Sequence, residues 1–242
     1  MEPRGDYIDG SFHAPTGETL TSHDPAREGR VVLETAGSPD RARLASEAAA
    51  AAQPAWEALG LDGRLEALAR FRAALAERVD GLSEAISREM GKIRSEARTE
   101  IKALVGRFGL DEGQVRAELR GGAIPGFPAE VIRYRPHGVV GVLGPFNFPL
   151  HLCHAHVVPA LLLGNTVVIK PSEVTPLSGE RYAEAAHAAG LPPGVLNVVQ
   201  GGGAVGAALV QNPHVRGLAF TGSWGTGRRI AEAALDRPDM LL

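Results

Sequence analysis

The chain has 242 residues, with 25 Lys and Arg against 28 Asp and Glu, a net charge of −3 and one cysteine. The near balance of charge excludes the broad cationic surface of nucleic-acid-binding proteins. The sequence contains no run of about 20 apolar residues, the length that a membrane span requires. One cysteine cannot form an internal disulfide and the first residues lack a signal-peptide pattern, so we expect a cytoplasmic protein.

The N-terminal region predicts a strand pair followed by a helix. "DYIDGSF" alternates around a turn at Asp9 and Gly10, which predicts two short strands on the surface. Ser38 is a suitable N-cap and Pro39 suits the first position of a helix. An Ala-rich helix is therefore expected from there to about Leu59.

A second helix is expected from about Gly63. Asp80 and Gly81 should break or bend it, and further helix is expected through Met90 and again, after Gly91, to Leu104. The apolar residues that share one face of this helix, at spacings of three and four, are Leu65, Leu68, Phe71, Leu75, Val79 and Leu82.

Residues 121–137 differ in composition from the helices before them. "GGAIPGFPAEVIRYRPH" contains glycines, prolines and a short β-like run at Val131, Ile132 and Tyr134. We expect a linker with an extended β-ribbon, whose exposed edges need a partner such as another subunit.

From Val139 onward, short apolar runs alternate with helical patterns. The predicted strands are 139–143, 166–169, 195–199 and 215–220, and the predicted helices are 149–163, 178–189, 204–211 and 225–235. This alternation indicates βαβ units and a doubly wound open parallel sheet, an α/β fold. We expect three parts, with strands and helices over 1–120 packed on the sheet domain, the ribbon over 121–137 and βαβ units over 138–242. Ligands of such sheets bind beyond the carboxyl ends of the strands.

The first strand ends in "GPFNFP", where two prolines and a glycine constrain the backbone around Asn147. A rigidly held amide donor can stabilise a developing oxyanion. The alternative is an ordinary turn in which Asn147 bonds neighbouring carbonyls.

The second strand ends in "KPSE", which brings Lys170 and Glu173 to the same edge. A cation and a carboxylate placed there can share the two hydroxyls of a ribose. The alternative is a solvated ion pair.

The third strand is followed by "GGGAVG", in which Gly201, Gly203 and Gly206 satisfy G-x-G-x-x-G. The motif follows a strand and opens a helix, but no acidic residue comes at the required place about 20 residues later. We interpret it as a turn of close approach and leave phosphate contact open.

The fourth strand ends in "FTGSWGTG", which joins the strand to a helix N-terminus. Free N–H groups and the helix dipole favour a pyrophosphate there, and Ser223 and Thr226 add hydroxyl donors. An ordinary capped helix start is the alternative.

The cluster "HLCHAH" contains two pairs at a spacing of three, His151 with His154 and Cys153 with His156. The pairs lie on different faces of the helix, so a zinc site with three or four convergent ligands is not expected. The remaining interpretations are a structural role and, for Cys153, a nucleophile whose pKa is lowered near a helix N-terminus.

Four segments, "RPHGVVGVLGPFNFPLHL", "PALLLGNTVVIKPSEVTPLSGE", "AGLPPGVLNVVQG" and "GLAFTGSWGTGR", together resemble the aldehyde dehydrogenase superfamily in their order. The earlier "YIDGSF" and "REMGKIRSEARTEI" are similar to its N-terminal part, so the resemblance covers nearly the whole chain. Within the superfamily, "RPHGV" and "GLPPGVLNVVQGG" are most similar to the succinylglutamate semialdehyde dehydrogenases of arginine catabolism. The resemblance implies a Rossmann-like domain and NAD-dependent oxidation of an aldehyde, N-succinylglutamate 5-semialdehyde, to its acid.

The resemblance also implies roles for individual residues. Asn147 matches the oxyanion amide, Phe146 lies at the nicotinamide end, and Glu173 favours NAD because it would repel the 2′-phosphate of NADP. The residues that it implies for cofactor binding are Pro145, Phe146, Lys170, Ser172, Glu173, Gly222, Ser223, Trp224, Gly225, Thr226 and Gly227.

The chain departs from the family pattern in its catalytic residues. In the family the glutamate base belongs to an E-(L/M)-G-G motif after the last predicted helix, and the cysteine nucleophile lies further on. Cys153 follows Asn147 too closely to match that nucleophile. We therefore expect an incomplete fold without the catalytic domain, no dehydrogenase activity and weakened NAD binding. The resemblance implies a homo-oligomer for full-length members of the family, but we do not expect this shorter chain alone to form one. The alternative is a noncatalytic nucleotide-binding module or one piece of a split enzyme.

Overall fold

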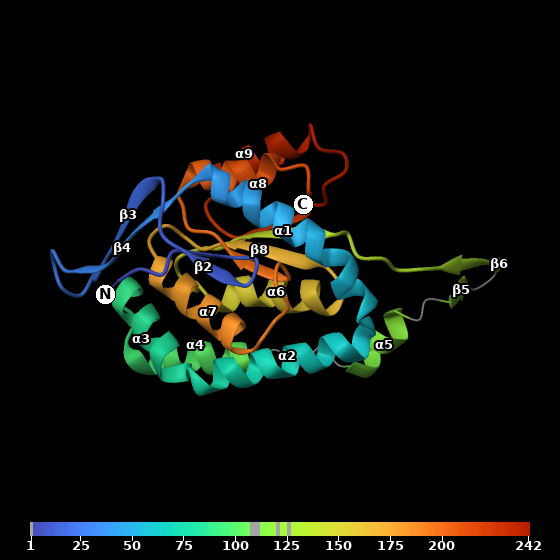
Figure 1. Cartoon of the computed structure of the whole chain (residues 1–242), viewed down its shortest axis with the longest axis horizontal. Helices are drawn as coiled ribbons and strands as arrows, with labels where there is room; N and C mark the ends of the chain where they lie inside the picture. Colours follow the sequence, from blue (N-terminus) through green and yellow to red (C-terminus); the bar gives the residue numbers. More distant parts are fainter. Residues whose placement is uncertain (1, 107–111, 120–121, 125–126) are drawn as a thin grey trace.

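The computed structural model describes residues 2–106, 112–119, 122–124 and 127–242. At its centre lies a six-stranded sheet with the strand order β10-β7-β8-β9-β1-β2, and helices cover both faces of this sheet (Figure 1). Within the part of the chain that the structure describes, none of the helices combines the length and the apolar composition that a bilayer span requires.

The middle of the sheet is parallel. Its strands are β7 (Val139–Leu143), β8 (Thr166–Lys170), β9 (Leu196–Val198) and β10 (Val215–Phe220). They are followed in turn by α6 (His151–Leu162), α7 (Pro176–Ala188), α8 (Gly203–Gln211) and α9 (Trp224–Ala234). Strand β7 pairs with both β8 and β10, so the direction of winding reverses there. The doubly wound parallel sheet predicted from the sequence is confirmed.

Two hydrophobic clusters pack against the two faces of this sheet. Val167 and Ile169 belong to the cluster shared with α2, α6 and α7, whereas Val168 between them belongs to the cluster shared with α1 and α8. Successive side chains of a strand point to opposite faces. A strand buried on both faces must therefore be apolar throughout, as β8 is.

The N-terminal hairpin consists of β1 (Asp6–Ile8) and β2 (Ser11–His13). The turn is formed by Asp9 and Gly10, which both have positive φ (51° and 76°), as the central residues of a type I′ turn require. The prediction of a hairpin is confirmed, but its placement on the surface is wrong for β1. This strand is buried and pairs antiparallel with β9, because Tyr7 and Ile8 supply apolar side chains to the core.

Helix α1 (Pro39–Ala58) begins as predicted, since the Ser38 hydroxyl accepts a hydrogen bond from Asp40 N at 3.2 Å. It packs on the same face of the sheet as α8 and α9 (Figure 1). Near its C-terminal end the indole of Trp56 donates to the carbonyl of Leu161 at 2.9 Å, which joins α1 to α6.

The next helices are α2 (Gly60–Glu77), α3 (Val79–Met90) and α4 (Arg94–Gly106). The predicted break at Asp80 and Gly81 is displaced, because the interruption occurs at Arg78, whose φ is −107°. Gly81 lies inside α3 and is exposed. It therefore lowers the intrinsic stability of the helix without leaving a gap in the core. Most of the predicted apolar face is confirmed as buried, with Phe71 fully inaccessible.

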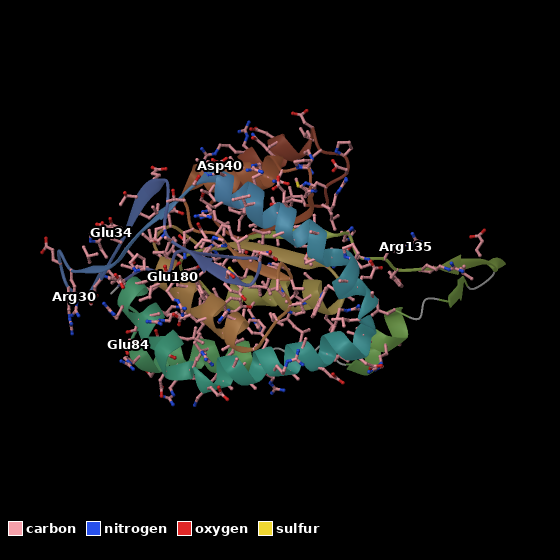
Figure 2. All side chains as sticks on the ribbon, viewed as in Figure 1. Arg30, Glu34, Asp40, Glu84, Arg135 and Glu180 are labelled. Atoms are coloured by element: carbon pink, nitrogen blue, oxygen red, sulfur yellow. The ribbon has the colours of Figure 1, made fainter. Side chains whose placement is uncertain are left out.

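Two small sheets lie outside the main one. Strand β3 (Glu18–His23) pairs with β4 (Val31–Gly37), and β5 (Gly122–Ile124) pairs with β6 (Phe127–Ile132) after the short helix α5 (Glu112–Leu119). The β5–β6 ribbon projects from the rest of the molecule (Figure 1), and residues 121, 125 and 126 of the predicted 121–137 segment lie outside the described residues. Figure 2 shows Arg30 and Glu34 on the β3–β4 hairpin and Arg135 on the segment that leads from the ribbon to β7.

A buried carboxylate caps α7 from a neighbouring helix. Glu89 of α3 is 5% exposed and accepts hydrogen bonds from Leu177 N at 2.7 Å and from Ser178 N at 2.8 Å. Burial raises the pKa of Glu89 from 4.5 to about 7, although the hydrogen bonds from Ser178 and Leu177 lower it. Because the folded pKa is raised, the stabilisation from this group is full below pH 4.5 and is lost as the pH rises through about 7.

We therefore expect the free energy of unfolding to fall less steeply between pH 4.5 and pH 7 in Glu89→Gln than in the parent chain. Over this pH range, the losses in the free energy of unfolding of the two proteins should differ by at most about 3 kcal/mol. Urea unfolding at several pH values measures it. The exposed Glu84 on the same helix is the matched control, and Glu84→Gln should leave the slope unchanged. Equal slopes for all three proteins would contradict the prediction.

Candidate functional site

A cavity of about 810 Å³ opens at the carboxyl ends of β7, β8 and β10. All four loops that follow the parallel strands contribute to its walls, and it lies where the winding of the sheet reverses between β7 and β10. Its volume is within the roughly 300–1,000 Å³ of small-molecule sites. Doubly wound sheets bind ligands at this position, so the cavity is the candidate site.

The structure brings most of the sequence-predicted residues to this cavity. Those that line it are Pro145, Phe146, Asn147, Lys170, Ser172, Glu173, Gly222, Ser223 and Thr226. Three others, Trp224, Gly225 and Gly227, belong to the first turn of α9 but do not line the cavity. Trp224 is 85% exposed, so its indole faces solvent.

The turn after β9 consists of glycine residues, so its backbone borders the cavity without intervening side chains. Gly201 has a φ of 151°, and a Cβ atom there would lie 2.1 Å from the Val205 side chain, so only glycine fits. Around Gly202 and Gly203 a Cβ atom would meet nothing within 4 Å, and both line the cavity together with Gly206. A ligand can therefore come close to the backbone here, as the close-approach interpretation requires.

Lys170 ends β8 and lies 7% exposed beneath the cavity. Its ammonium donates to the carbonyls of Pro171 at 2.5 Å and Gly201 at 2.7 Å, and the carboxylate of Glu173 lies 3.6 Å away. Burial lowers the pKa of Lys170, while Glu173 raises it. The alternative of a solvated ion pair is wrong for the lysine, although Glu173 itself is half exposed.

The N-terminus of α9 borders the opposite side of the cavity. The hydroxyl of Ser223 accepts a hydrogen bond from Thr226 N at 3.3 Å, and its carbonyl accepts one from Gly227 N at 3.0 Å. Among the described residues, no acceptor is bonded to the N–H groups of Trp224 and Gly225. These groups, at the positive end of the helix dipole, can bind an anion.

Asn147 lies at the mouth of the cavity, in the turn between β7 and α6. Its side chain is exposed, and the amide oxygen accepts a hydrogen bond from Phe148 N at 3.1 Å. Within the described part of the chain, the amide nitrogen donates to no neighbouring carbonyl, unlike in the alternative of an ordinary turn. The two donors of this nitrogen are thus available to a ligand.

Part of the cavity wall was missed by sequence reasoning. Ala207 and Val210 of α8 face Ile230 and Ala233 of α9 across it, and together they form an apolar slot. The only signal in the sequence was the spacing of small and aliphatic residues on these two helices, which core packing explains equally well.

The histidine and cysteine cluster lies away from the cavity wall. Cys153 is 3% exposed, and burial raises the pKa of its thiol to about 12 although Lys170 lowers it. The interpretation as a nucleophile with a lowered pKa is therefore wrong. His154 is buried, with Nδ1 2.7 Å from the hydroxyl of Tyr182. In the described ranges, no three His, Cys, Asp or Glu side chains are arranged to hold a metal ion.

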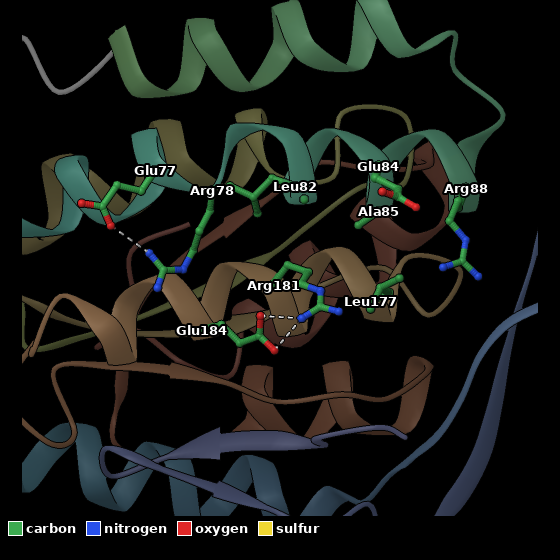
Figure 3. Close-up of a pocket in the computed structure, with 10 residues that line it drawn as sticks. Glu77, Arg78, Leu82, Glu84, Ala85, Arg88, Leu177, Arg181 and Glu184 are labelled. Carbon is green, nitrogen blue, oxygen red and sulfur yellow. Dashed lines mark hydrogen bonds and ion pairs between the residues drawn. The ribbon is translucent and has the colours of Figure 1, made fainter. Parts of the chain in front are cut away.

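A second hollow of about 390 Å³ lies between α3 and α7 (Figure 3). Two pairs of charged groups line it, since Arg181 donates to both carboxylate oxygens of Glu184 and Arg78 lies 3.5 Å from Glu77. The N-terminal amides of α7 nearby already donate to Glu89. The α7 amides beside this hollow are therefore already occupied, unlike those of Trp224 and Gly225 at the strand-end cavity.

The chain is similar to known proteins over nearly its whole length. The family model described as the aldehyde dehydrogenase family matches residues 12–240. N-succinylglutamate 5-semialdehyde dehydrogenase 2 of Caulobacter vibrioides is 44% identical over 98% of this chain and 49% of its own length. The chain spans about half the length of the curated relatives it matches.

Solved structures agree with these matches. An NAD-dependent aldehyde dehydrogenase from Sinorhizobium meliloti superposes with a TM-score of 0.90 at 33% identity, over 98% of this chain and 48% of that one. An NADP-dependent glyceraldehyde-3-phosphate dehydrogenase from Bacillus halodurans, complexed with NADP, superposes with a TM-score of 0.88 at 30% identity, over 96% and 51%. The described fold is thus shared with about half of each of these proteins.

Proposed function

The chain belongs to the aldehyde dehydrogenase family, and from this premise we propose that it forms the cofactor-binding part of an enzyme that oxidises an aldehyde to a carboxylic acid with NAD. The observation that carries the proposal is the cavity at the point between β7 and β10 where the winding of the sheet reverses, lined by groups from four separate loops. We infer that residues 138–242 supply this site and that residues 1–120 support it from both faces of the sheet.

The residues around the cavity fit a dinucleotide. The apolar slot between Val210 and Ile230 suits an adenine ring, and Glu173 with Lys170 suits the hydroxyls of its ribose. The N–H groups at the start of α9 suit the pyrophosphate, and the bare backbone at Gly203 leaves room for close approach. When bound, NAD would supply the hydride acceptor of the reaction.

The remaining proposed roles belong to the mouth of the cavity. Phe146, which is 55% exposed, would lie beside the nicotinamide end. The amide nitrogen of Asn147 would donate a hydrogen bond to the oxyanion that develops on the aldehyde carbon after nucleophilic attack. Cys153 does not serve as that nucleophile, because a buried thiol with a pKa of about 12 is protonated at neutral pH.

For the substrate, we propose N-succinylglutamate 5-semialdehyde, an intermediate of arginine catabolism. The support is the 44% identity to a relative named for this activity and the sequence resemblance of "RPHGV" and "GLPPGVLNVVQGG". We also propose that the protein is cytoplasmic, and that in the full-length enzyme the projecting β5–β6 ribbon contacts another copy of the chain.

Choice of NAD over NADP is attributed to Glu173, whose carboxylate is next to Lys170 and would repel a 2′-phosphate on the same ribose. Glu173→Gln should raise the affinity for NADP relative to NAD by roughly tenfold, since the side chain is half exposed and screening limits the repulsion. Equilibrium dialysis with each cofactor measures the ratio. Glu232→Gln removes an exposed carboxylate of α9 outside the cavity and should leave it unchanged. A ratio in Glu173→Gln equal to that of the control would contradict this role.

A second candidate function is noncatalytic binding of a nucleotide, by a separate module or by one piece of a split enzyme. The specific observation in its favour is that the only cysteine in the sequence, Cys153, is buried, and burial raises the pKa of its thiol to about 12. Equilibrium dialysis with NAD, together with an assay of NADH formation from N-succinylglutamate 5-semialdehyde, tests both candidates. We expect weak NAD binding without turnover by these residues alone. Absence of NAD binding would refute the first candidate, and turnover would refute the second.

A further inference from the structure

Asn147 receives little support from its own contacts. It occupies the turn between Leu143, where β7 ends, and His151, where α6 begins. Within the described part of the chain, the only hydrogen bond of its side chain is the one from Phe148 N to its amide oxygen. An amide that is to stabilise an oxyanion must be held in a fixed position before the reaction. Its orientation must therefore be fixed through the residues on either side of it.

One buried carboxylate reaches the far side of this turn. Glu100 of α4 is 5% exposed, and its Oε1 atom accepts a hydrogen bond from the backbone N–H of His151 at 3.4 Å. That N–H belongs to the first turn of α6, where helix N–H groups lack partners within the helix and a negative charge is favoured. Glu100 thus fixes the point at which the turn enters α6.

The second oxygen of the same carboxylate pairs with Lys92, which contacts Phe148, the residue directly after Asn147. The Oε2 atom of Glu100 lies 2.7 Å from the ammonium nitrogen of Lys92, whose side chain is 17% exposed. That nitrogen lies 3.6 Å from the centre of the Phe148 ring. An ammonium group over an aromatic ring attracts it electrostatically, and the ion pair holds this ammonium in one place. Phe148 is 44% exposed, so the Lys92 ammonium covers part of a ring that the protein otherwise only partly surrounds.

We propose that Glu100 and Lys92 are positioning residues that hold the two ends of the Phe148–His151 segment and thereby fix the orientation of the Asn147 amide. The proposal rests on the proposed function for the role of Asn147 in the reaction. Neither residue lines the cavity, and both come from the helical region before residue 107, whereas the turn that they hold belongs to the βαβ part. The N-terminal helices thus help to build the site as well as to cover the sheet.

The order of the turn can be measured in the chain itself by NMR. In a ¹⁵N-labelled sample, the side-chain amide signals of Asn147 are identified by their loss in Asn147→Asp. Lys92→Met keeps the length of the side chain and removes its charge. We expect the steady-state ¹H–¹⁵N NOE of the Asn147 side chain and of the Phe148 backbone to fall in this variant, while signals of β8 stay unchanged. Lys92→Arg should retain the parent values, since a guanidinium can also pair with Glu100 and lie over a ring.

Two further variants keep the test decisive. Lys102→Met removes an exposed lysine of α4 and should leave all these signals as they are. Glu100→Gln keeps an acceptor for His151 N and weakens the pair with Lys92, so it should reproduce the loss of order at Phe148 even if Lys92→Met fails to fold. The proposal is overturned if the Asn147 and Phe148 values in Lys92→Met, or in Glu100→Gln where Lys92→Met does not fold, match those in Lys102→Met. NAD binding, measured separately by dialysis, tests the proposed function, so failure of one is distinguishable from failure of the other.

Discussion

Replacing Ala207 with phenylalanine is expected to lower the affinity of the chain for NAD at least tenfold. Ala207 is exposed on α8 and lines the cavity opposite Ile230 and Ala233 of α9. A benzyl group at this position would occupy the apolar slot that we propose for adenine, and the buried surface that the ring would have gained on binding would be lost. A tenfold change corresponds to about 1.4 kcal/mol of binding free energy.

The same helix offers a matched control for this substitution. Ala204 is also exposed on α8 but does not line the cavity, so Ala204→Phe adds the same ring to the same helix outside the slot. Equilibrium dialysis with NAD compares the two variants with the parent chain, and circular dichroism confirms that both are folded. Equal affinities in the two variants would show that the slot between α8 and α9 does not bind the cofactor.

The largest effect on stability is expected from Phe71→Ala. Phe71 of α2 is fully inaccessible to solvent, and its ring is 5.3 Å from that of Tyr182 of α7 in an edge-to-face arrangement and 6.3 Å from that of His154 of α6. Truncation removes the contacts of three helices at one point and leaves a cavity, which costs about 3–5 kcal/mol for a buried phenylalanine. Urea denaturation of the parent and the variant measures this loss.

The neighbouring residue in α2 provides the control for this prediction. Arg72 is exposed, and Arg72→Ala should change the free energy of unfolding by no more than about 0.5 kcal/mol. Phe71→Leu keeps much of the volume and should lose clearly less stability than Phe71→Ala. A loss below about 1 kcal/mol in Phe71→Ala would mean that α2 does not contribute to the cooperative core.

Periodicity and turn chemistry sufficed to predict the main elements. The strand limits at β7 and β10 agree with those expected from apolar runs, because both strands are bounded by glycine or polar turns. The start of α1 at Ser38 was equally well determined, since an N-cap followed by Pro39 permits one arrangement. Local signals of this kind are contained within a few residues, and no tertiary contact was needed to interpret them.

Other features depended on contacts that a single sequence does not reveal. The burial of β1 follows from its pairing with β9, almost 200 residues away, and the break between α2 and α3, which both contact α7, occurs at Arg78 rather than at Gly81. In the candidate site, the loops were predictable as turns of glycine, proline and polar residues, whereas the apolar slot was not. The alanine and isoleucine side chains that form it have the same pattern as residues of the core.

The antiparallel pairing of β1 with β9 also bears on how the chain folds. The carboxylate of Asp6 accepts a hydrogen bond from Gln200 N at 2.7 Å, so β1 cannot take its place in the sheet until the residues around Gln200 have been synthesised. Closing a loop of this length slows folding, and until it closes, β9 presents an unpaired edge to other molecules. Expression temperature and chaperone supply should therefore affect the yield of this protein more than its final stability would suggest.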